Sequence, residues 1–270
     1  MTDSGSQAVP AATVLLLRDA PGGLEVFMVV RHREIDFAAG AMVFPGGKVE
    51  EADADASLAS RCTHAAPVAP ESMVLRVAAI REAFEESGIL LARRRGCRDV
   101  VSADHAARLA RDYRSRLATG HMGIADLVVA ENLELACDLL VPFAHWITPQ
   151  IMPKRYDTHF FIAAVPQDQI AVHDGSETVE SVWMSPRDVL AAAEDGRYTV
   201  IFPTHMNLAK LARSASVTEA IATAQATRIV TVLPEIDLAS GVLRIPAAAG
   251  YDVTEASFDE QSRNHRARPR

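Results

Sequence analysis

Short apolar runs of strand length, separated by turn residues, occupy much of the chain. The first two, Ala12–Arg18 and Leu24–Arg31, flank the cluster Asp19–Gly23, whose composition is typical of turns, and together they predict a β-hairpin. A third run, Ala41–Phe44, ends at Pro45-Gly46-Gly47, where proline fixes φ and glycine permits conformations closed to other residues. Later strands are expected at Val141–Ile147, Thr158–Val165 and Thr178–Met184, and as two strands around Ser240-Gly241 within Arg228–Ile245.

Helical periodicity alternates with these strands. Apolar residues recur at helical spacing between Ser72 and Gly88, which predicts a helix over about Ser72–Gly88, with a continuation to Arg93 as the alternative. The polar end of the chain, Asp252–Arg270, is expected to be mobile. One α/β domain with added helices fits this pattern better than two domains. Further helices are expected at Ala103–Thr119, at Pro186–Glu194 behind the N-cap residue Ser185, and at Thr204–Thr223.

Composition and charge narrow the class of protein. The 270 residues are 49% hydrophobic and 23% charged, as in ordinary soluble domains. A formal net charge of −8 argues against a nucleic-acid partner, so an anionic substrate needs a local basic site. No apolar run approaches a membrane span and Met1–Pro10 does not resemble a signal peptide, which favours a cytoplasmic protein without a membrane partner.

The remaining compositional signals are weaker. Cys62, Cys97 and Cys137 form no CxxC pair, which argues against a disulfide framework and against a structural zinc site. The basic residues are almost all arginines and alanine is abundant, which is typical of a GC-rich bacterial genome. Both signals are consistent with the reducing bacterial cytoplasm.

A spaced group of acidic residues lies within Arg81–Ile89. On a helix, Glu82 lies three and four residues before Glu85 and Glu86, so the three carboxylates share one side. One interpretation is a solvated acidic helix face. The other is a site for a hard cation such as Mg²⁺ or Mn²⁺, which prefers carboxylate oxygens and would turn the mutual repulsion of the carboxylates into attraction.

This segment, Arg-Glu-Ala-Phe-Glu-Glu-Ser-Gly-Ile, resembles the REUxEExGU half of the Nudix box, in which U is a bulky aliphatic residue; Ala83 is smaller than usual. Phe44–Glu50 resembles the start of the box, and Asp53 stands six residues after Gly47, where the family has glutamate. Gly47 and Arg81 are 34 positions apart instead of the 14 of the uninterrupted box, so 20 residues are inserted. Such an insert is typical of the branch of peroxisomal coenzyme A diphosphatases.

Further segments resemble that branch in the same order along the chain. Arg31–Arg33 followed by Gly40–Gly47 resembles the approach to the box, Arg155–Phe161 resembles the strand R-[FY]-D-T-x-F-F, and Trp183–Pro186 resembles the close before a helix. The resemblance covers about Ala11–Leu211. We therefore expect a Nudix domain at 11–227 with an insert at about 54–72, and a C-terminal extension at 228–270 whose last part is mobile.

The resemblance implies a fold, a cofactor and catalytic residues. The fold is an α/β/α sandwich with a mixed central sheet, and the cofactor is Mg²⁺ or Mn²⁺. Glu82, Glu85 and Glu86 would bind the metal together with the carbonyl of Gly46, and Arg81 would orient a box carboxylate. The general base is either Glu82 or Glu177, which lies on the loop before the strand toward Trp183. The competing interpretation of Glu177 is a solvated loop residue without a catalytic role.

The implied reaction is hydrolysis of a diphosphate in a nucleoside-diphosphate-linked small molecule. Coenzyme A or an acyl-coenzyme A is the expected substrate; ADP-ribose, NADH or nucleotide sugars are alternatives, as is a catalytically silent module that only binds a nucleotide. Family members are often dimers, so the helix at Thr204–Thr223 would serve either a homodimer interface or the core. The candidate phosphate ligands are Arg31, Arg33, Lys48 and Arg155. A surface salt bridge is the simpler role for each of them taken singly.

Other chemistries have weaker support. No GxSxG motif occurs, and no histidine partner can be assigned to a nucleophilic cysteine. The scattered histidines show no HxxxH spacing and no neighbouring cysteine, so they are expected to be structural or exposed and not metal ligands: His32, His145, His159, His173 and His205.

Overall fold

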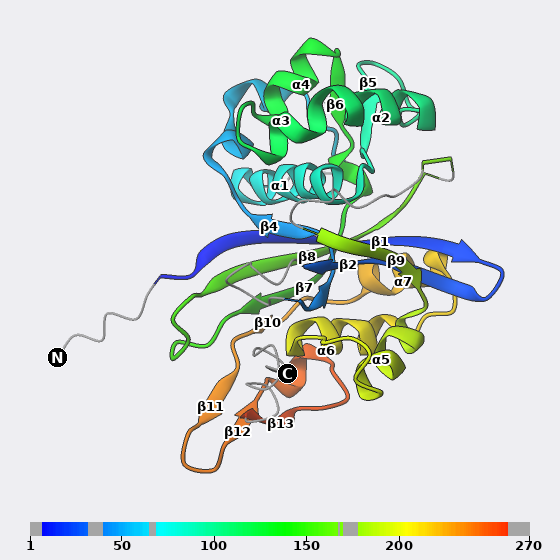
Figure 1. Cartoon of the computed structure of the whole chain (residues 1–270). Coiled ribbons are helices and arrows are strands. Elements are labelled where there is room, and N and C mark those ends of the chain that lie inside the picture. Colours follow the sequence, from blue (N-terminus) through cyan, green and yellow to red (C-terminus); the bar gives the residue numbers. More distant parts are fainter. Residues whose placement is uncertain (1–6, 32–39, 65–68, 167, 170–177, 259–270) are drawn as a thin grey trace.

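One mixed β-sheet lies between two layers of helices (Figure 1). The computed structural model describes residues 7–31, 40–64, 69–166, 168–169 and 178–258. The sheet and its helices form the α/β/α arrangement that the resemblance implies. Helix α1 (Pro70–Ser87) covers one face, and α5 (Pro186–Glu194), α6 (Phe202–Leu211) and α7 (Val217–Ala226) cover the other.

The predicted hairpin forms the centre of the sheet. β1 (Val9–Ala20) pairs antiparallel with β2 (Gly23–Arg31) and parallel with β8 (Tyr156–Ala164). The strand order is β10-β7-β8-β1-β2-β3, with β4 paired to β1 and β9 paired to β2, and β10 is parallel to β7. The other strands of this sheet are β3 (Met42–Val43), β4 (Gly46–Lys48), β7 (Val141–Ile147), β9 (Thr178–Met184) and β10 (Thr231–Val232).

The apolar run in β1 is explained by helices on both faces of the sheet. Successive side chains of a strand point to opposite faces. Val14 and Leu16 pack in the core beneath α1, whereas Leu15 and Leu17 pack in the core that faces α5–α7, and all four are fully buried. A strand covered on both sides therefore has a continuously apolar sequence.

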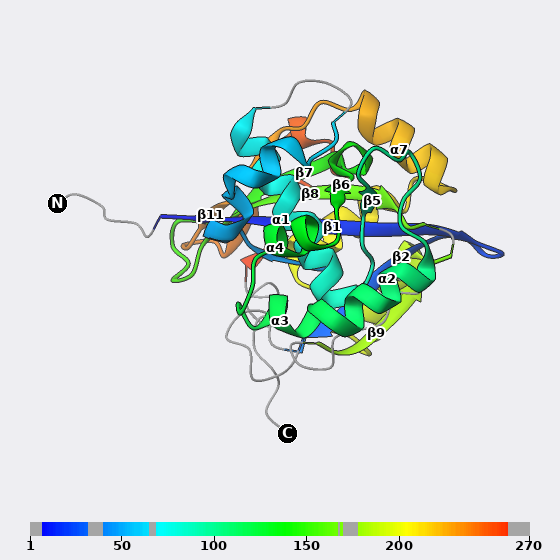
Figure 2. The same ribbon diagram turned by 90° about the horizontal axis from the view of Figure 1, so that it is seen from above.

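An outer layer covers α1 on the side away from the sheet (Figure 2). A π-helical segment, Ala110–Arg114, joins two of its helices, so the helix expected at Ala103–Thr119 is present with a change of hydrogen-bond register at its centre. The two helices that it joins are α2 (Ala103–Leu109) and α3 (Ser115–Ala118). The rest of the layer, which was not predicted, consists of α4 (Ile124–Ala130) and the small sheet of β5 (Ala92–Arg94) with β6 (Leu133–Leu135).

Helix α1 ends where glycine permits a left-handed backbone. Gly88 has φ 75° and its N–H donates to the carbonyl of Phe84 at 2.9 Å. Such a glycine stops a helix because other residues rarely adopt this conformation. The predicted end of the helix at Gly88 is confirmed, and the alternative continuation to Arg93 is wrong, because that residue belongs to β5.

The helix predicted at Thr204–Thr223 is also wrong as one element. α6 ends at Leu211, and α7 begins after Ser216, whose side chain accepts a hydrogen bond from the N–H of Glu219. Serine favours helix caps over helix interiors because its hydroxyl competes for backbone groups. The Ser-Ala-Ser sequence at 214–216 thus separates two helices.

The C-terminal part of the chain contributes β10 to the main sheet and forms a separate three-stranded sheet. β11 (Glu235–Asp237) and β12 (Val242–Arg244) form the hairpin predicted around Ser240-Gly241, and β13 (Glu255–Ser257) adds a third strand. The expectation of a mobile tail from Asp252 onward is therefore wrong for β13, while residues 259–270 lie outside the described residues.

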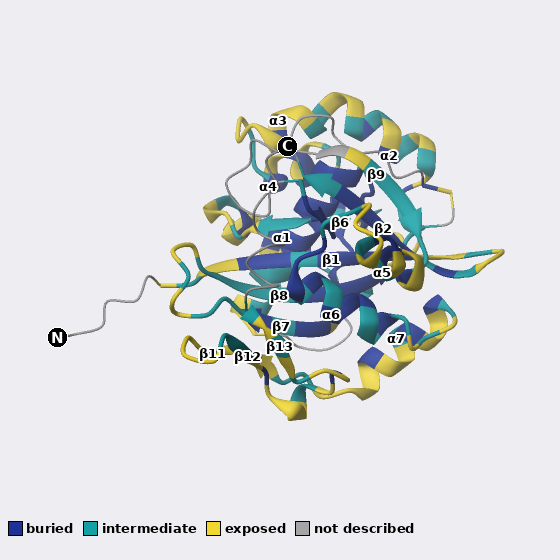
Figure 3. Cartoon of the chain, turned by 60° about the horizontal axis from the view of Figure 1, so that its bottom comes forward, coloured by how far each residue is buried: buried dark blue, intermediate teal, exposed yellow. Residues whose placement is uncertain are grey.

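Burial follows the layers of the fold. Figure 3 shows buried residues along the strands of the main sheet and exposed residues along the outer sides of the helices. Among the described residues, no helix has both the length and the apolar character that crossing a bilayer requires.

Candidate active site

Glu82, Glu85 and Glu86 lie in the buried part of helix α1. Its residues Val77–Ser87 are all buried; Glu82 and Glu85 are 9% exposed, and Glu86 is 4% exposed. The interpretation as a solvated helix face is therefore wrong. Carboxylates held together in the interior require a compensating positive charge, because burial removes the water that would otherwise screen them.

The buried guanidinium of Arg81 supplies part of that charge. Its Nε and Nη2 donate to the carboxylate of Asp53 at 2.8 and 3.1 Å, and its Nη1 donates to Glu82 at 2.9 Å and to Glu85 at 3.2 Å. Nη2 also donates to the main-chain carbonyl of Lys48 at 2.8 Å. The rigid fork of an arginine thus fixes two carboxylates of α1 relative to strand β4.

Asp53 stands just before the insert, on a single 3₁₀ turn, η1 (Glu51–Ala54). Its side chain is fully buried and also accepts the N–H of Glu50 at 2.8 Å. Aspartate is one methylene shorter than the glutamate of the family. The tight turn brings its carboxylate to Arg81 at 2.8 Å all the same, so the substitution keeps a buried ion pair.

Strand β4 brings a glycine backbone against the carboxylates. The N–H of Gly46 donates to Oε2 of Glu86 at 3.1 Å. A Cβ atom on Gly47 would lie 2.4 Å from Oε1 of Glu82, so a residue with a side chain cannot occupy that position unless the carboxylate moves. The two glycines pair with β1 as part of strand β4, and the lack of a side chain at Gly47 allows the close approach of Glu82.

The charges of the site shift the pKa values of two of its groups. Burial alone lowers the pKa of Arg81, but its hydrogen bonds to Asp53 and the negative charges of Glu82 and Glu85 outweigh burial and raise that pKa. Burial raises the pKa of Glu85 to about 8. The positive charge of Arg81 lowers this pKa, whereas the negative charge of Glu82 raises it further, and the raising effects outweigh the lowering one. Arg81 therefore stays charged, while negative charge at Glu85 is costly.

The donor set fits a divalent cation. Oε1 of Glu85 is buried and has no hydrogen-bond partner within the part of the chain that the structure describes. A buried oxygen without a donor costs free energy, which a metal ligand bond offsets. Arg81 supplies one positive charge to several buried carboxylates, so a dication bound among them would offset the repulsion that remains. Carboxylate oxygens are the ligands that Mg²⁺ and Mn²⁺ prefer.

Two of the predicted phosphate ligands do not face the carboxylates. Lys48 is exposed on β4, and because Gly47 faces Glu82, the side chain of Lys48 points to the opposite face of the strand. Arg155 precedes β8, where its Nε donates to the carbonyl of Thr148 at 3.0 Å and supports the connection from β7.

The other predicted residues lie at the edge of the described chain. Arg31 ends β2, and its Nε is buried without a hydrogen-bond partner among the described residues. Arg33 and the alternative general base, Glu177, lie outside the described residues. Both remain predictions of the sequence.

Two polar residues at the site were missed. Arg114, in the π-helical segment, donates from Nε to the main-chain carbonyl of Glu85 at 2.7 Å. Glu50 places a half-exposed carboxylate 3.9 Å from Nη1 of Arg81. Arg114 carries no local signal in the sequence, because it reaches Glu85 only through the packing of its helix against α1. Glu50 lies in the segment that resembles the start of the box, but it was not assigned a role there.

A mixed sheet between helix layers, with an acidic helix packed on a glycine strand, is the arrangement of the Nudix class. The chain belongs to the Nudix hydrolase family, because the family model described as the NUDT19 Nudix domain matches its residues 57–211. The match covers more than half of the chain and includes all of α1.

Named relatives agree with this assignment. "Putative nudix hydrolase 7" of Caenorhabditis elegans is 27% identical over 190 residues, which cover 70% of this chain and 56% of that protein. "Acyl-coenzyme A diphosphatase NUDT19" of Xenopus laevis is 23% identical over 234 residues, which cover 72% of this chain and 61% of that protein. The chain thus spans about three fifths of the length of these curated relatives.

A solved structure supports the fold. The NUDIX hydrolase from Alicyclobacillus acidocaldarius superposes with a TM-score of 0.66 at 27% sequence identity. The alignment covers 80% of this chain and 96% of that chain. The sandwich described above is therefore shared across almost the whole of that hydrolase.

Proposed function

We propose that this protein is a pyrophosphohydrolase that requires Mg²⁺ or Mn²⁺ and cleaves the diphosphate of a nucleoside-diphosphate-linked substrate. The observation that carries the proposal is the burial of three carboxylates, of which Glu82 and Glu85 accept from Arg81 and Glu86 accepts from the glycine backbone of β4. This arrangement is costly in a protein that does not bind a cation, because buried like charges repel each other.

In this proposal the chain divides the work among its residues. Glu82, Glu85 and Glu86 hold the cation, with the carbonyl of Gly46 as a further ligand. Arg81, itself held by Asp53, keeps the carboxylates of Glu82 and Glu85 in position. When bound, the cation polarises the phosphate oxygens and lowers the pKa of the attacking water.

The hydrolytic step needs a proton acceptor and positive charge for the substrate. Glu82 or Glu177 accepts a proton from the water as its oxygen bonds to phosphorus and the bridging oxygen leaves. The two products are phosphate monoesters. Arg31 has a buried Nε without a partner among the described residues, which makes it the best-supported phosphate ligand of the predicted set. Arg33, Lys48 and Arg155 are weaker candidates.

Coenzyme A or an acyl-coenzyme A is the substrate we favour. Support comes from the interrupted Nudix box and from the NUDT19 relatives, which are named acyl-coenzyme A diphosphatases. Cleavage of this substrate gives 3′,5′-ADP and 4′-phosphopantetheine or its acyl derivative. ADP-ribose, NADH and nucleotide sugars contain the same diphosphate bond and are the alternatives.

A substrate panel tests this proposal. The full chain is incubated with Mg²⁺ or Mn²⁺ and each of coenzyme A, an acyl-coenzyme A, ADP-ribose, NADH and a nucleotide sugar, and products are separated by chromatography. We expect cleavage of coenzyme A or its acyl derivative, and loss of that activity in Glu86→Gln. Cleavage of ADP-ribose alone would reject the substrate, and no cleavage of any of them would favour a silent nucleotide-binding module over the enzyme.

A further inference from the structure

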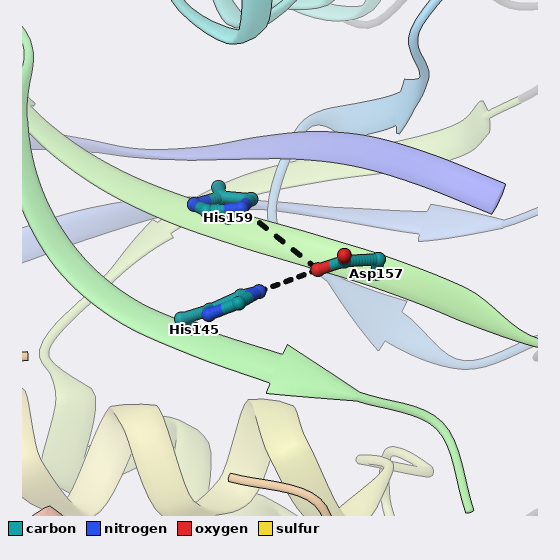
Figure 4. A group of neighbouring side chains, drawn as sticks. All are labelled: His145, Asp157 and His159. Atoms are coloured by element: carbon teal, nitrogen blue, oxygen red, sulfur yellow. Dashed lines mark hydrogen bonds and ion pairs between the residues drawn. The ribbon is translucent and has the colours of Figure 1, made fainter. Parts of the chain in front are cut away.

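A second group of metal-ligating side chains lies outside the carboxylate site. Strands β7 and β8 bring together His145, Asp157 and His159, whose candidate ligand atoms all lie within 4.8 Å of one another (Figure 4). The sequence suggested that the histidines are scattered. The antiparallel register pairs His145 directly with His159, and Asp157 lies two residues along β8 on the same face.

The three side chains point their ligand atoms at a common point. Nε2 of His145 contacts Oδ1 of Asp157, and Nε2 of His159 lies 3.8 Å from the same oxygen. The two imidazole rings stack with centroids 4.0 Å apart and an interplanar angle of 20°. Ligands bound to one metal ion at about 2.0–2.2 Å lie about 3–3.5 Å from each other, so small side-chain rotations suffice to admit an ion.

Thr231 of β10 fixes the orientation of the first imidazole. Its Oγ1 lies 2.8 Å from Nδ1 of His145. When Nδ1–H donates to this hydroxyl, the lone pair of the ring is on Nε2, which faces Asp157. Metal-binding histidines are commonly held in this way, through a hydrogen bond from the nitrogen that does not bind the metal.

From this geometry we infer that His145, Asp157 and His159 form a binding site for a divalent transition-metal ion of the Zn²⁺, Co²⁺ or Ni²⁺ class. Imidazole nitrogens suit these ions, in contrast to the all-oxygen set of Glu82, Glu85 and Glu86, which suits Mg²⁺ and Mn²⁺. The side chains of Asp157 and His159 are about one-third exposed, so water or an anionic ligand can complete the coordination.

The two sites lie on the same face of the sheet. Gly47, against which Glu82 packs, pairs with Ala12 of β1, and Ala12 in turn pairs with His159. Phe161, two residues beyond His159, belongs to the core beneath α1, which places His159 on that face as well. Two strand spacings of about 4.8 Å separate the main chain at Gly47 from the main chain at His159, which is about 10 Å across the sheet.

Co²⁺ binding to the full chain, stripped of metal by a chelator, tests this inference without any measurement of turnover. We expect Co²⁺ to give visible absorption bands typical of nitrogen ligation, and calorimetry to show a Zn²⁺ site that Glu86→Gln retains. The variants His159→Gln and Asp157→Asn each remove a metal ligand, so each should abolish these bands. Loss of a supporting hydrogen bond weakens metal binding by about 10- to 100-fold, and loss of a ligand should weaken Zn²⁺ binding by more than that. Thr231→Val, which removes only that support, should weaken it by about 10-fold.

The matched control is His121→Gln, which changes an exposed histidine outside both sites. Circular dichroism of the metal-free variants separates loss of a ligand from loss of the fold. Absorption bands and Zn²⁺ affinity that are unchanged in His159→Gln and Asp157→Asn, or a wild-type protein without a nitrogen-ligated Co²⁺ site, would overturn the inference. Because binding is measured directly, this outcome is independent of whether the carboxylate site hydrolyses a diphosphate.

Discussion

At the scale of single residues, the site depends on two glycines that have different neighbours. A Cβ atom on Gly47 would meet the end of the Glu82 side chain, whereas one on Gly46 would lie 2.7 Å from the main chain of β1. A side chain can move aside more readily than a strand. The same substitution should therefore affect function at one position and stability at the other.

Gly47→Ala should displace Glu82 and lower the turnover number by about 100-fold, because a displacement of about 1 Å in an active site causes a loss of that size. The melting temperature of this variant should change little. Gly46→Ala should instead lower the free energy of unfolding by about 1–3 kcal/mol. Steady-state kinetics and urea unfolding measure the two effects. Gly22→Ala, at a turn with no atom near the added Cβ, is the control. Equal turnover in Gly47→Ala and the wild type would show that the position of Glu82 is not critical.

Asp53 is predicted to stabilise the fold through Arg81. Asp53→Asn removes the charge from a buried pair joined at 2.8 and 3.1 Å, so the free energy of unfolding should fall by about 3 kcal/mol. Urea unfolding of the variant measures this loss. Asp55→Asn changes an exposed neighbour that caps a short turn, and it should cost much less stability, because asparagine caps as well as aspartate. Similar losses in the two variants would contradict the assigned pair.

The sequence could not predict the burial of these residues. The spacing of Glu82, Glu85 and Glu86 places them on one side of a helix, but it does not say whether that side faces water or the sheet. Arg114 reaches Glu85 from 29 positions away, through the packing of one helix against another. The motif resemblance, and not the local pattern, pointed to the acidic cluster as a site.

At the scale of elements, prediction succeeded where the signal is local. The hairpin of β1 and β2, the strands β7 and β9 and the helix α5 all follow from apolar runs, turns and caps inside the segment. Strands β4, β5 and β6 have three residues each, too few to show a period, and they form only because a partner strand lies beside them. The group of His145, Asp157 and His159 likewise depends on the pairing register.

The outer layer of helices is joined by an ion pair that should make stability depend on pH. Glu131, at the end of α4, accepts hydrogen bonds from Arg108 of α2 at 2.6 Å and from Tyr113 at 2.7 Å. The hydrogen bond from Arg108, opposed by partial burial and helped by Tyr113, lowers the pKa of Glu131 from 4.5 to about 2. A carboxyl group with a lowered pKa stabilises the fold above its unfolded pKa and loses that contribution as the pH falls toward its folded pKa.

Glu131→Gln should therefore be less stable than the wild type at pH 7, by roughly 1 kcal/mol after allowance for solvent screening. The difference should shrink as the pH falls from about 4.5 toward 2. Urea unfolding at pH 7 and at pH 3 measures it, and Glu134→Gln, whose partner Arg95 is half exposed, serves as a control. A difference that stays constant between these pH values would mean that the ion pair does not form.

At the scale of the whole molecule, the layered fold explains how an acidic protein can bind an anionic substrate. The formal charge of −8 does not favour phosphates in general, but part of the acidic excess is concentrated at one buried point under α1. A dication bound there would present positive charge to a diphosphate. The overall fold was predictable through the resemblance, since a mixed sheet between helices accommodates the whole pattern of strands and helices.

The most direct test of this account is the rate of diphosphate hydrolysis as Mg²⁺ or Mn²⁺ is added back to the chelator-treated full chain. The substrate is the one cleaved best in the panel described above. We predict no turnover without the cation, recovery on its addition to the wild type, and a rate at least about 100-fold lower for Glu86→Gln at every cation concentration. Turnover that survives removal of the cation, or a Glu86→Gln variant as active as the wild type, would contradict the account.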